Sequence, residues 1–455
     1  MAVRTLITGA LVVTMDAADR VIEGGAVLVE GGKIERVGPV SDFAQLDQVR
    51  LETVNASGHI LMPGLVNGHT HMGDSLFRGL VEDLPLEPWL ERLWVSERQF
   101  LSYDTVRLGA DLAIAEMIRG GITSALDMFW FPEAAADAAI SAGFRLSTGP
   151  IMFDFEGPDG VAAEERPAHG ELWLERYSGE PLIHPAVQPH QVLTVAPERI
   201  RLARQLANRH GAVFHAHCAE TEAEVAGSVA RFGRTPLAHL HHLGALDGAA
   251  ALAHLVHLTD QDFGLLAESG AGALHNPLSN LKLGSGIAEV PRMLDRGIPV
   301  AIGTDGAVSS NDLDMWTAIR VAGLLQRGVH QDPLLTPARQ TIRMATAGAA
   351  DAIGLGEVTG RLTAGHRADL VLIDLDRVHL TPAFDPWPLL AYTVGRADVT
   401  DVMIEGTWVM RGRKLLTVDP AAAVAGAREL GHRIAAHNAA HVAAHSGGAD
   451  GRSES

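Results

Sequence analysis

The sequence predicts an α/β protein in which a (β/α)8 TIM-like barrel carries a small β-sandwich formed by both ends of the chain. Three observations support this prediction. Short apolar strands alternate with Ala-, Leu-, Arg- and Glu-rich helical stretches through the middle of the chain, which is typical of βα units and a parallel sheet. Strand-rich blocks precede and follow this middle part. Residues of the kinds that bind metals end the predicted strands, where barrel enzymes place their chemistry.

Residues 1–60 are expected to form the first part of the β-sandwich. From Thr5 to about Ile60, apolar and polar residues alternate, and Gly-Gly pairs interrupt them, as in Gly24–Lys33. This pattern is typical of short antiparallel strands joined by tight turns. Residues 361–417 form a matching block, with the runs Ala368–Asp374 and Val402–Met410. Two such blocks around a long middle predict one β module built from both chain ends.

Eight strands, enough to close a barrel, are expected within residues 61–360. Their predicted starts lie near Leu61, Ile122, Phe144, Pro185, Ala212, Ala251, Ala271 and Pro299. Polar residues of ligand type follow at the strand exits: His69, His71, Asp127, Asp154, His190, His217, His254, His275 and Asp305. A random sequence would not place such residues at every exit. The site is therefore expected at the carboxyl ends of the strands.

Residues 418–455 are expected to form a helix and a mobile tail. An Ala-rich helix is predicted from Pro420 to about His445, before a polar tail that has little to bury. Three histidines of this helix, His437, His441 and His445, are spaced four residues apart, which would suit a metal. We favour a solvated helix face, because no acidic partner accompanies them.

Composition and charge exclude several classes of protein. The formal charge is −19, from 36 basic and 55 acidic side chains, which disfavours nucleic acid and anionic membranes as partners. No apolar run reaches the roughly 20 residues needed to span a bilayer, and Leu6–Met15 lacks the flanks of a signal peptide. We expect a cytoplasmic protein. Cys218 is the only cysteine, so any metal must be held by histidine and carboxylate, and Cys218 is expected to pack.

Two histidines end the first predicted barrel strand. Side chains alternate between the faces of a strand, so His69 and His71 point to one side and can converge on one ion. His217, at the end of the fifth strand, can supply a third nitrogen. His215 has the same parity and competes for that place, and we favour His217 because it lies nearer the exit. Glu220, just beyond, would lie over the mouth as a proton donor.

Asp305 ends the last predicted strand, within Gly303–Gly306. A carboxylate there can bind a metal through one oxygen and take a proton from the bound water with the other. A single Asp between glycines more often marks a turn, so this interpretation depends on the three histidines. Together the four side chains predict a site for a divalent ion. Zinc is favoured by three imidazoles and one carboxylate with an open position, and iron is the alternative.

The lysines bear on the number of ions. The chain has three, Lys33, Lys282 and Lys414, and none follows the fourth strand at His190. Binuclear hydrolases on this barrel need a carboxylated lysine at that exit, so we expect one ion per subunit. Only Lys282 lies in the barrel region, which disfavours a Schiff-base mechanism.

Further candidates end the sixth and seventh strands. His254 is the candidate to orient the attacking water or the leaving group, whereas His257, two residues on, is as readily structural. Polar residues within His275–Leu283 are expected to line the pocket, and some of them to make loop hydrogen bonds only.

These motifs resemble those of the amidohydrolase superfamily, in particular the aminohydrolase subgroup that includes S-adenosylhomocysteine/5′-methylthioadenosine deaminases and triazine hydrolases. The resemblance extends over nearly the whole chain. It is carried by Pro63–His71, Phe77–Leu80, His217–Thr221, Ala253–Leu258, His275–Leu283, Gly303–Gly306 and Ala368–Leu372. The run His275–Leu283 and the Asp-Gly pair at residue 305 resemble the adenosine-type deaminases most.

The resemblance implies roles for individual residues. Glu220 and His254 would handle the ring-nitrogen proton and the water. Ser309 would contact a purine nitrogen, and Glu97 would clasp ribose hydroxyls. The other implied substrate contacts are His190, Trp94 and Asn280. It also implies a small heterocyclic substrate and a homo-oligomer, a dimer or larger.

The expected reaction is hydrolytic deamination of an amino-substituted N-heterocycle, foremost an adenosine-type aminopurine. Its carbon is a poor electrophile, so the reaction needs an activated water and protonation of the adjacent ring nitrogen. We expect Asp305 to accept the water proton and return it to the leaving ammonia, while Glu220 protonates the ring. The alternatives are a triazine chloro- or alkylamino-hydrolase, a cyclic amide hydrolase, or a guanine, cytosine or pterin deaminase on the same site. A non-catalytic assembly protein would be expected to have lost the ligands.

Overall fold

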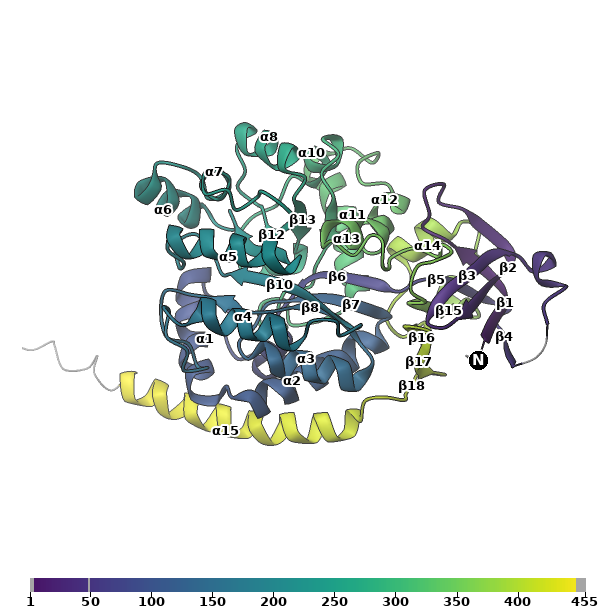
Figure 1. Cartoon of the computed structure of the whole chain (residues 1–455), viewed down its shortest axis with the longest axis horizontal. Helices are drawn as coiled ribbons and strands as arrows, with labels where there is room; N and C mark the ends of the chain where they lie inside the picture. Colours follow the sequence, from purple (N-terminus) through teal and green to yellow (C-terminus); the bar gives the residue numbers. More distant parts are fainter. Residues whose placement is uncertain (1–3, 48–49, 447–455) are drawn as a thin grey trace, which may run out of the picture.

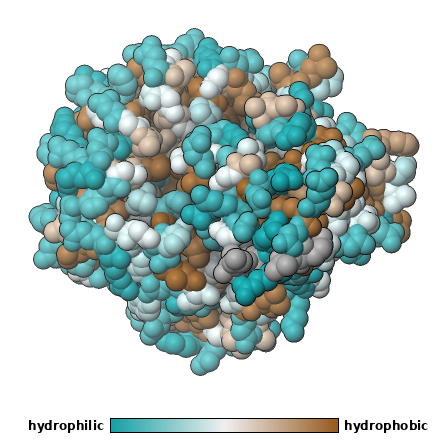
Figure 2. Space-filling model, turned by 45° about the vertical axis from the view of Figure 1, so that its right-hand side comes forward, coloured by the Kyte–Doolittle hydropathy of each residue, from teal (hydrophilic) through white to brown (hydrophobic). Residues whose placement is uncertain are grey.

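The structure is a computed structural model that describes residues 4–47 and 50–446. Two sheets organise it: a parallel barrel wrapped in helices, and a mostly antiparallel sheet made by both ends of the chain, at the right of Figure 1. The predicted α/β barrel with a sandwich-like terminal module is confirmed. In the view of Figure 2, hydrophobic side chains are interspersed with hydrophilic ones.

The barrel strands are parallel and neighbour one another in chain order. They are β6 (Leu65–Thr70), β7 (Ile122–Asp127), β8 (Arg145–Thr148), β10 (Ile183–Pro189), β11 (Val213–Cys218), β12 (Ala250–His254), β13 (Gly272–His275) and β14 (Val300–Ile302), with β9 (Ile151–Met152) pairing with β10 off this path. The ring closes between β14 and β6. There the backbone N–H of Asp305 donates to the carbonyl of His69 at 3.0 Å, and Asn67 exchanges hydrogen bonds of 2.7 and 3.0 Å with Thr304. All strand exits therefore face one mouth.

Seven of the eight predicted barrel strands begin within two residues of the expected positions, and the first is wrong. The segment at Leu61 belongs to β5 (His59–Pro63), which pairs with β1 and β15 of the terminal sheet, and the barrel begins at Leu65. The apolar pattern runs through both strands without a polar break, which hid the boundary. A Cβ on Gly64, between them, would lie 2.1 Å from the side chain of Thr123, so only glycine fits this crossing.

The terminal sheet joins residues more than 300 positions apart in the sequence. Its strands are β1 (Arg4–Val13), β2 (Val21–Glu30), β3 (Lys33–Pro39), β4 (Leu51–Asn55), β5, β15 (Leu370–Asp374), β16 (Val399–Ile404), β17 (Thr407–Arg411) and β18 (Lys414–Leu415). The central pair is β5 with β15, which run antiparallel. Ile7, Val12, Leu61 and Leu370 lie in one buried cluster, so both chain ends share a core.

Helices surround the barrel (Figure 1). Those of the barrel region are α1 (Leu86–Phe100), α2 (Tyr103–Arg119), α3 (Pro132–Ala142), α4 (Arg166–Arg176), α5 (Pro197–His210), α6 (Glu222–Phe232), α7 (Pro236–His242), α8 (Asp260–Ser269), α9 (Pro277–Lys282), α10 (Val290–Asp295), α11 (Met315–His330), α12 (Ala338–Arg343) and α13 (Ala347–Ala352). The 3-10 helices are η1 (Val40–Phe43), η2 (Met72–Phe77) and η3 (Val378–Leu380), and α14 (Pro386–Tyr392) precedes β16. Within the described ranges, no helix combines the length and apolarity needed to cross a membrane.

The predicted C-terminal helix is present as α15 (Pro420–Ser446), which runs along α1 and α2 (Figure 1). Ser96 of α1 donates a hydrogen bond of 3.1 Å to Asn438 of α15. His437 packs edge-on against Phe100, with ring centroids 5.4 Å apart. The side chains of His441 and His445, and the predicted mobile tail after Ser446, lie outside the described part of the chain.

Candidate active site

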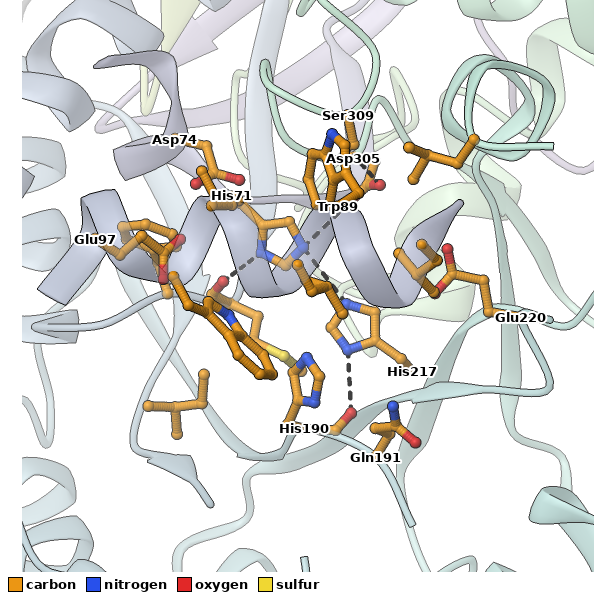
Figure 3. A pocket seen from close by; sticks show the side chains of 18 of the residues that line it. His71, Asp74, Trp89, Glu97, His190, Gln191, His217, Glu220, Asp305 and Ser309 are labelled. Carbon is orange, nitrogen blue, oxygen red and sulfur yellow. Dashed lines mark hydrogen bonds and ion pairs between the residues drawn. The ribbon is translucent and has the colours of Figure 1, made fainter. Parts of the chain in front are cut away.

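Side chains from three strand exits converge at the barrel mouth (Figure 3). Figure 3 shows His71, His217 and Asp305 turned toward one another. The Nε2 atoms of His69 and His71 lie 3.3 and 3.1 Å from Oδ1 of Asp305, and Nε2 of His217 lies 3.4 Å from Nε2 of His71. The three histidines come from β6 and β11, and Asp305 follows β14. The four residues singled out in the sequence as metal ligands are thus brought together, although up to 236 positions separate them.

The donor atoms suit a four-coordinate metal. Zinc–nitrogen and zinc–oxygen bonds of about 2.0–2.1 Å would place tetrahedral ligand atoms about 3.3 Å apart, close to the separations seen here. Nε2 of His69 and Oδ1 of Asp305 are buried, and neither has a hydrogen-bond partner among the described residues. Buried polar atoms rarely stay unpaired without a reason. The donor set and its open atoms therefore fit one divalent ion.

Backbone carbonyls fix the tautomers of two of these histidines. Nδ1 of His71 donates to the carbonyl of Met128, and Nδ1 of His217 donates to the carbonyl of His190 at 3.0 Å. A carbonyl can only accept, so each Nδ1 carries a proton, and Nε2 is the nitrogen that each ring turns toward the site and could offer to a metal once deprotonated. This is the arrangement expected of metal-binding histidines.

His215 plays a different part from His217. Its Nδ1 donates to the carbonyl of Ala251 at 2.9 Å, which leaves its Nε2 free to accept from Nδ1 of His69 at 2.9 Å. The ring of His215 therefore lies behind His69, inside the barrel, and orients it. The choice between the two histidines, left open by their shared parity, is decided by which of them reaches the mouth.

Asp305 is held in a strained but well-supported position. Its φ of 58° is left-handed, a conformation that costs about 1–3 kcal/mol and that often occurs at functional sites. The hydroxyls of Thr70 and Thr304 donate to its carbonyl at 3.2 and 3.1 Å. Ser309 donates to Oδ2 at 2.7 Å, while Oδ1 faces the histidines. The two carboxylate oxygens therefore have different surroundings.

Burial and the charge of Asp305 set the protonation of the cluster. Burial lowers the pKa of His69 to about 4, despite the contact with Asp305, and holds that of His217 well below its usual value. Burial disfavours the charged form of His71 too, but the contact with Asp305 and its charge raise the pKa of His71 to about 10. Although burial works against ionisation of Asp305, its contacts with His69 and His71 hold its pKa well below the ordinary range. Asp305 is therefore an anion.

Glu220 lies on the opposite side of His71 from Glu97 (Figure 3). Burial raises its pKa, partly offset by His254, whose Nε2 lies 3.7 Å from Oε2 of Glu220. Glu224 accepts the backbone N–H groups of Ala219 and Glu220 at 3.1 and 2.7 Å, which fixes the loop. A buried carboxyl whose pKa is raised holds its proton to higher pH than an exposed one, which suits it to act as an acid.

His254 has a fixed orientation beside this carboxyl. Its Nδ1 lies 2.8 Å from Oδ1 of Asn280, an acceptor, so Nδ1 carries the proton and Nε2 faces Glu220 and the cluster. Its φ of 76° is left-handed, as at Asp305. Asn280 therefore contacts Nδ1 of His254, whereas Glu220 lies near Nε2 of the same ring. Asn280 is not among the residues that line the pocket, and the substrate contact implied for it stays a prediction.

A pocket of about 730 Å³ opens beside the cluster. Its walls include His71, His217, Asp305, Glu220 and Ser309 at one end, and Trp89, Trp94, Glu97, Trp130, Phe153 and His190 farther along. Trp130 donates to Oε2 of Glu97 at 3.1 Å. Burial raises the pKa of Glu97 to about 7, against this hydrogen bond. His190 stacks on Phe153, and burial lowers its pKa to about 3.

Other strand-exit residues lie elsewhere. Asp127 accepts the N–H of Met72 at 2.6 Å and supports η2 from behind. Asp154 pairs with Arg199 at 2.5 Å outside the pocket. His275 is buried under His254 and does not line the pocket, and Nε2 of His257 contacts the carbonyl of Ser285 at 2.7 Å. These four residues follow strands without contributing to the cluster.

Asp74 is a pocket residue that the sequence analysis missed. It lies in η2, three residues after His71, and its side chain is buried with Oδ1 unpartnered. Burial and the nearby Glu97 raise its pKa well above the ordinary value. The only signal in the sequence is an acidic residue within an otherwise apolar run after His71, which reads as a turn residue.

Comparisons with known proteins agree with this geometry. The model of the amidohydrolase family matches residues 60–409. A 5-methylthioadenosine/S-adenosylhomocysteine deaminase of Syntrophobacter fumaroxidans is 40% identical over 414 residues, which cover 91% of this chain and 94% of that protein.

Two solved structures superpose over nearly the whole chain. An adenosine deaminase from Xanthomonas campestris with bound zinc has a TM-score of 0.91 and 37% identity, covering 95% of this chain and 98% of that one. An atrazine chlorohydrolase from Arthrobacter aurescens TC1 complexed with zinc has a TM-score of 0.87 and 26% identity, covering 94% and 100%.

Proposed function

Since the chain belongs to the amidohydrolase family, we propose that it is a metal-dependent hydrolase that deaminates an adenosine-type aminopurine and releases ammonia. One observation carries the proposal: two buried carboxyl groups line the same pocket, Glu220, whose pKa is raised by burial, and Asp305, an anion within 3.3 Å of two imidazoles. Deamination of an aromatic amine needs this combination of acid and base. The relatives named as adenosine-type deaminases support the choice of substrate.

The proposed metal ligands are Nε2 of His69, His71 and His217 and Oδ1 of Asp305. A divalent ion bound there would supply a water whose pKa is lowered to about 7. Zinc fits the donor set best, and zinc is bound in both similar solved structures. Two groups of possible metal ligands in the described chain, His69 with His71 and His217, and His69 with His254 and Asp305, share His69, which supports one ion per subunit.

The proton transfers follow from the positions of Asp305 and Glu220. Asp305 accepts a proton from the attacking water, because its second oxygen, Oδ2, is held by Ser309 and stays ionised. Glu220 donates its proton to the ring nitrogen next to the amino-bearing carbon. Asp305 then passes its proton to the amino group, which leaves as ammonia. When the product carbonyl forms, the remaining hydroxyl proton restores Glu220, so the protons balance.

The other residues bind and orient. His254, held by Asn280, presents Nε2 beside Glu220 and keeps the water and the leaving group in line. Glu97, oriented by Trp130, offers a carboxylate to hydroxyl groups of the substrate. His190 and Trp94 form part of the pocket wall. A homo-oligomer, dimer or larger, and a cytoplasmic location stay predictions.

Ammonia release from a substrate panel, combined with metal analysis, tests the proposal. Purified protein is expected to contain one zinc per chain and to release ammonia from adenosine-type substrates, and faster than from guanine, cytosine or a pterin. A chelator should abolish the activity, and added zinc should restore it. Chloride or alkylamine release from a triazine without ammonia from any aminopurine would overturn the proposal. Undiminished activity of metal-free protein would do the same.

A further inference from the structure

The pocket leads away from the metal-type donors along a series of aromatic rings. His190 lies 4.8 Å from His217 between ring centroids, and Phe153 stacks on His190 at 4.5 Å. Phe153 in turn contacts Trp130 at 4.7 Å and Trp94 at 6.5 Å. Leu86, Leu90, Leu93 and Ile151 complete this end of the pocket. The far end is therefore a continuous apolar and aromatic surface, here called the aromatic end.

Acidic side chains outnumber permanent cations around the pocket. Among the described residues that line it there is no lysine or arginine, whereas five carry carboxyl groups: Asp74, Glu97, Glu220, Glu224 and Asp305. An anionic group on a ligand would meet repulsion here and find no cationic partner at the aromatic end. Burying an unpaired charge in such surroundings is strongly unfavourable.

Arg166 lies close behind the aromatic end but is not available to a ligand. Its guanidinium covers the ring of Trp130 at 5.2 Å and binds both oxygens of Asp159 at 3.0 Å. The residue is only 3% exposed and does not line the pocket. Its charge is thus neutralised by Asp159, and its role is to hold Trp130 in place.

We propose that the aromatic end is a specificity subsite for an uncharged, apolar substituent at the sugar end of the substrate, and that it rejects a carboxylate or phosphate in that position. This inference rests on the proposed deaminase function and narrows it. The amino-bearing ring lies between Glu220 and Asp305, the sugar near Glu97, and the 5′ substituent against Trp94, Phe153 and Trp130. The pocket therefore separates substrates that share an adenine and a ribose by the charge and polarity of their 5′ ends.

Four adenosines that differ only at the 5′ end test this inference in the zinc-loaded protein. Replacing hydroxyl by methylthio should raise kcat/KM about tenfold, because one extra apolar group in such a pocket is worth roughly 10–200-fold. S-adenosylhomocysteine, with its zwitterionic amino-acid tail, should be at least about 100-fold worse than 5′-methylthioadenosine, and adenosine 5′-monophosphate worse still, since the carboxylate or phosphate finds no lysine or arginine in the pocket.

Two substitutions of Trp94 make the test specific to charge. Trp94→Arg places a cation at the half-buried rim of the aromatic end, and Trp94→Leu is the matched uncharged control. Trp94→Arg should lower the preference for methylthio over the homocysteine tail at least tenfold. Trp94→Leu should lower kcat/KM for both substrates by similar factors and so keep the preference within about threefold.

The outcomes separate this inference from the function on which it rests. If the wild-type protein deaminates 5′-methylthioadenosine and S-adenosylhomocysteine within threefold of each other, the charge selectivity is wrong and the deaminase function stands. An unchanged preference in folded, zinc-loaded Trp94→Arg protein would place the discrimination elsewhere and also overturn the inference. If no aminopurine releases ammonia, the proposed function fails and the inference fails with it.

Discussion

The two ends of the barrel both bury charged groups, but they treat them in opposite ways. At the amino end, Arg145 at the start of β8 is fully buried and binds both oxygens of Asp369, at 2.7 and 3.1 Å, together with Glu405. Asp369 also accepts the backbone N–H of Glu405 at 2.8 Å. At the mouth, Nε2 of His69 and Oδ1 of Asp305 are equally buried and lack hydrogen-bond partners.

We expect the paired charges around Arg145 to contribute to stability, and the groups at the mouth to contribute to function. A buried charge costs free energy unless it is paired, so a paired cluster is expected to hold the terminal sheet to the barrel. At the mouth, the anion of Asp305 is opposed only by the imidazoles of His69 and His71, an arrangement that a bound metal ion would complete. The comparison therefore predicts that substitutions at the mouth abolish activity with little loss of stability, whereas those at the amino end do the reverse.

Asp305→Asn should have the largest effect on activity. Asparagine keeps the shape but can neither accept the water proton nor contribute an anionic oxygen to a metal, so kcat is expected to fall by about 10³–10⁴-fold or more. Metal content by mass spectrometry should fall as well, while the urea midpoint should change little. A variant with near-normal turnover would refute the assigned role of Asp305.

Arg145→Met should have the largest effect on stability. It leaves Asp369 buried without its partner, which is expected to lower the free energy of unfolding by about 3–5 kcal/mol. Urea unfolding followed by circular dichroism measures the loss, and kcat/KM at low denaturant should stay within about threefold. The matched control is Arg20→Met, which breaks an ion pair with Asp16 in which the arginine is half exposed, and should change the midpoint much less. Equal losses in the two variants would break the comparison.

Glu220→Gln sharpens the distinction between acid and base within the mouth. Glutamine cannot protonate the ring nitrogen, so kcat/KM should fall by about 10²–10³-fold. Burial raises the pKa of Glu220, and the acid acts only while protonated. The wild-type rate should therefore decline as pH rises through that raised pKa, and this alkaline decline should be missing in the variant. Persistence of the same decline would assign it to another group.

The sequence predicted well those features that depend on local pattern. The parity of His69 and His71 along one strand, and the position of His217 and Asp305 at strand exits, placed them correctly once eight parallel strands were recognised. The family match extends over the same motifs. Side chains alternate along a strand because of backbone geometry alone, so the side on which each residue lies can be predicted without knowledge of tertiary packing.

Features that depend on packing could not be predicted. The boundary at Gly64 was invisible because the apolar pattern of β5 continues into β6. Asn280 and Asp127 were candidates for the pocket, but Asn280, in α9, contacts His254, and Asp127, at the end of β7, contacts Met72. Asp74 became visible only when η2 brought it beside Glu97. Each case was decided by the direction of a side chain relative to a neighbour far away in the sequence.

Ser309→Ala should have the smallest effect and tests how the mouth positions its anion. Ser309 donates to Oδ2 of Asp305, so alanine removes one hydrogen bond to a charged group, and kcat/KM is expected to fall about tenfold. If Ser309 acts through Asp305, adenosine and 7-deazaadenosine should lose activity equally. If instead it contacts a purine nitrogen, as the family resemblance implies, only adenosine should be affected, because the deaza compound lacks that nitrogen. The hydroxyl proton already has an acceptor within 2.7 Å, which favours the equal loss.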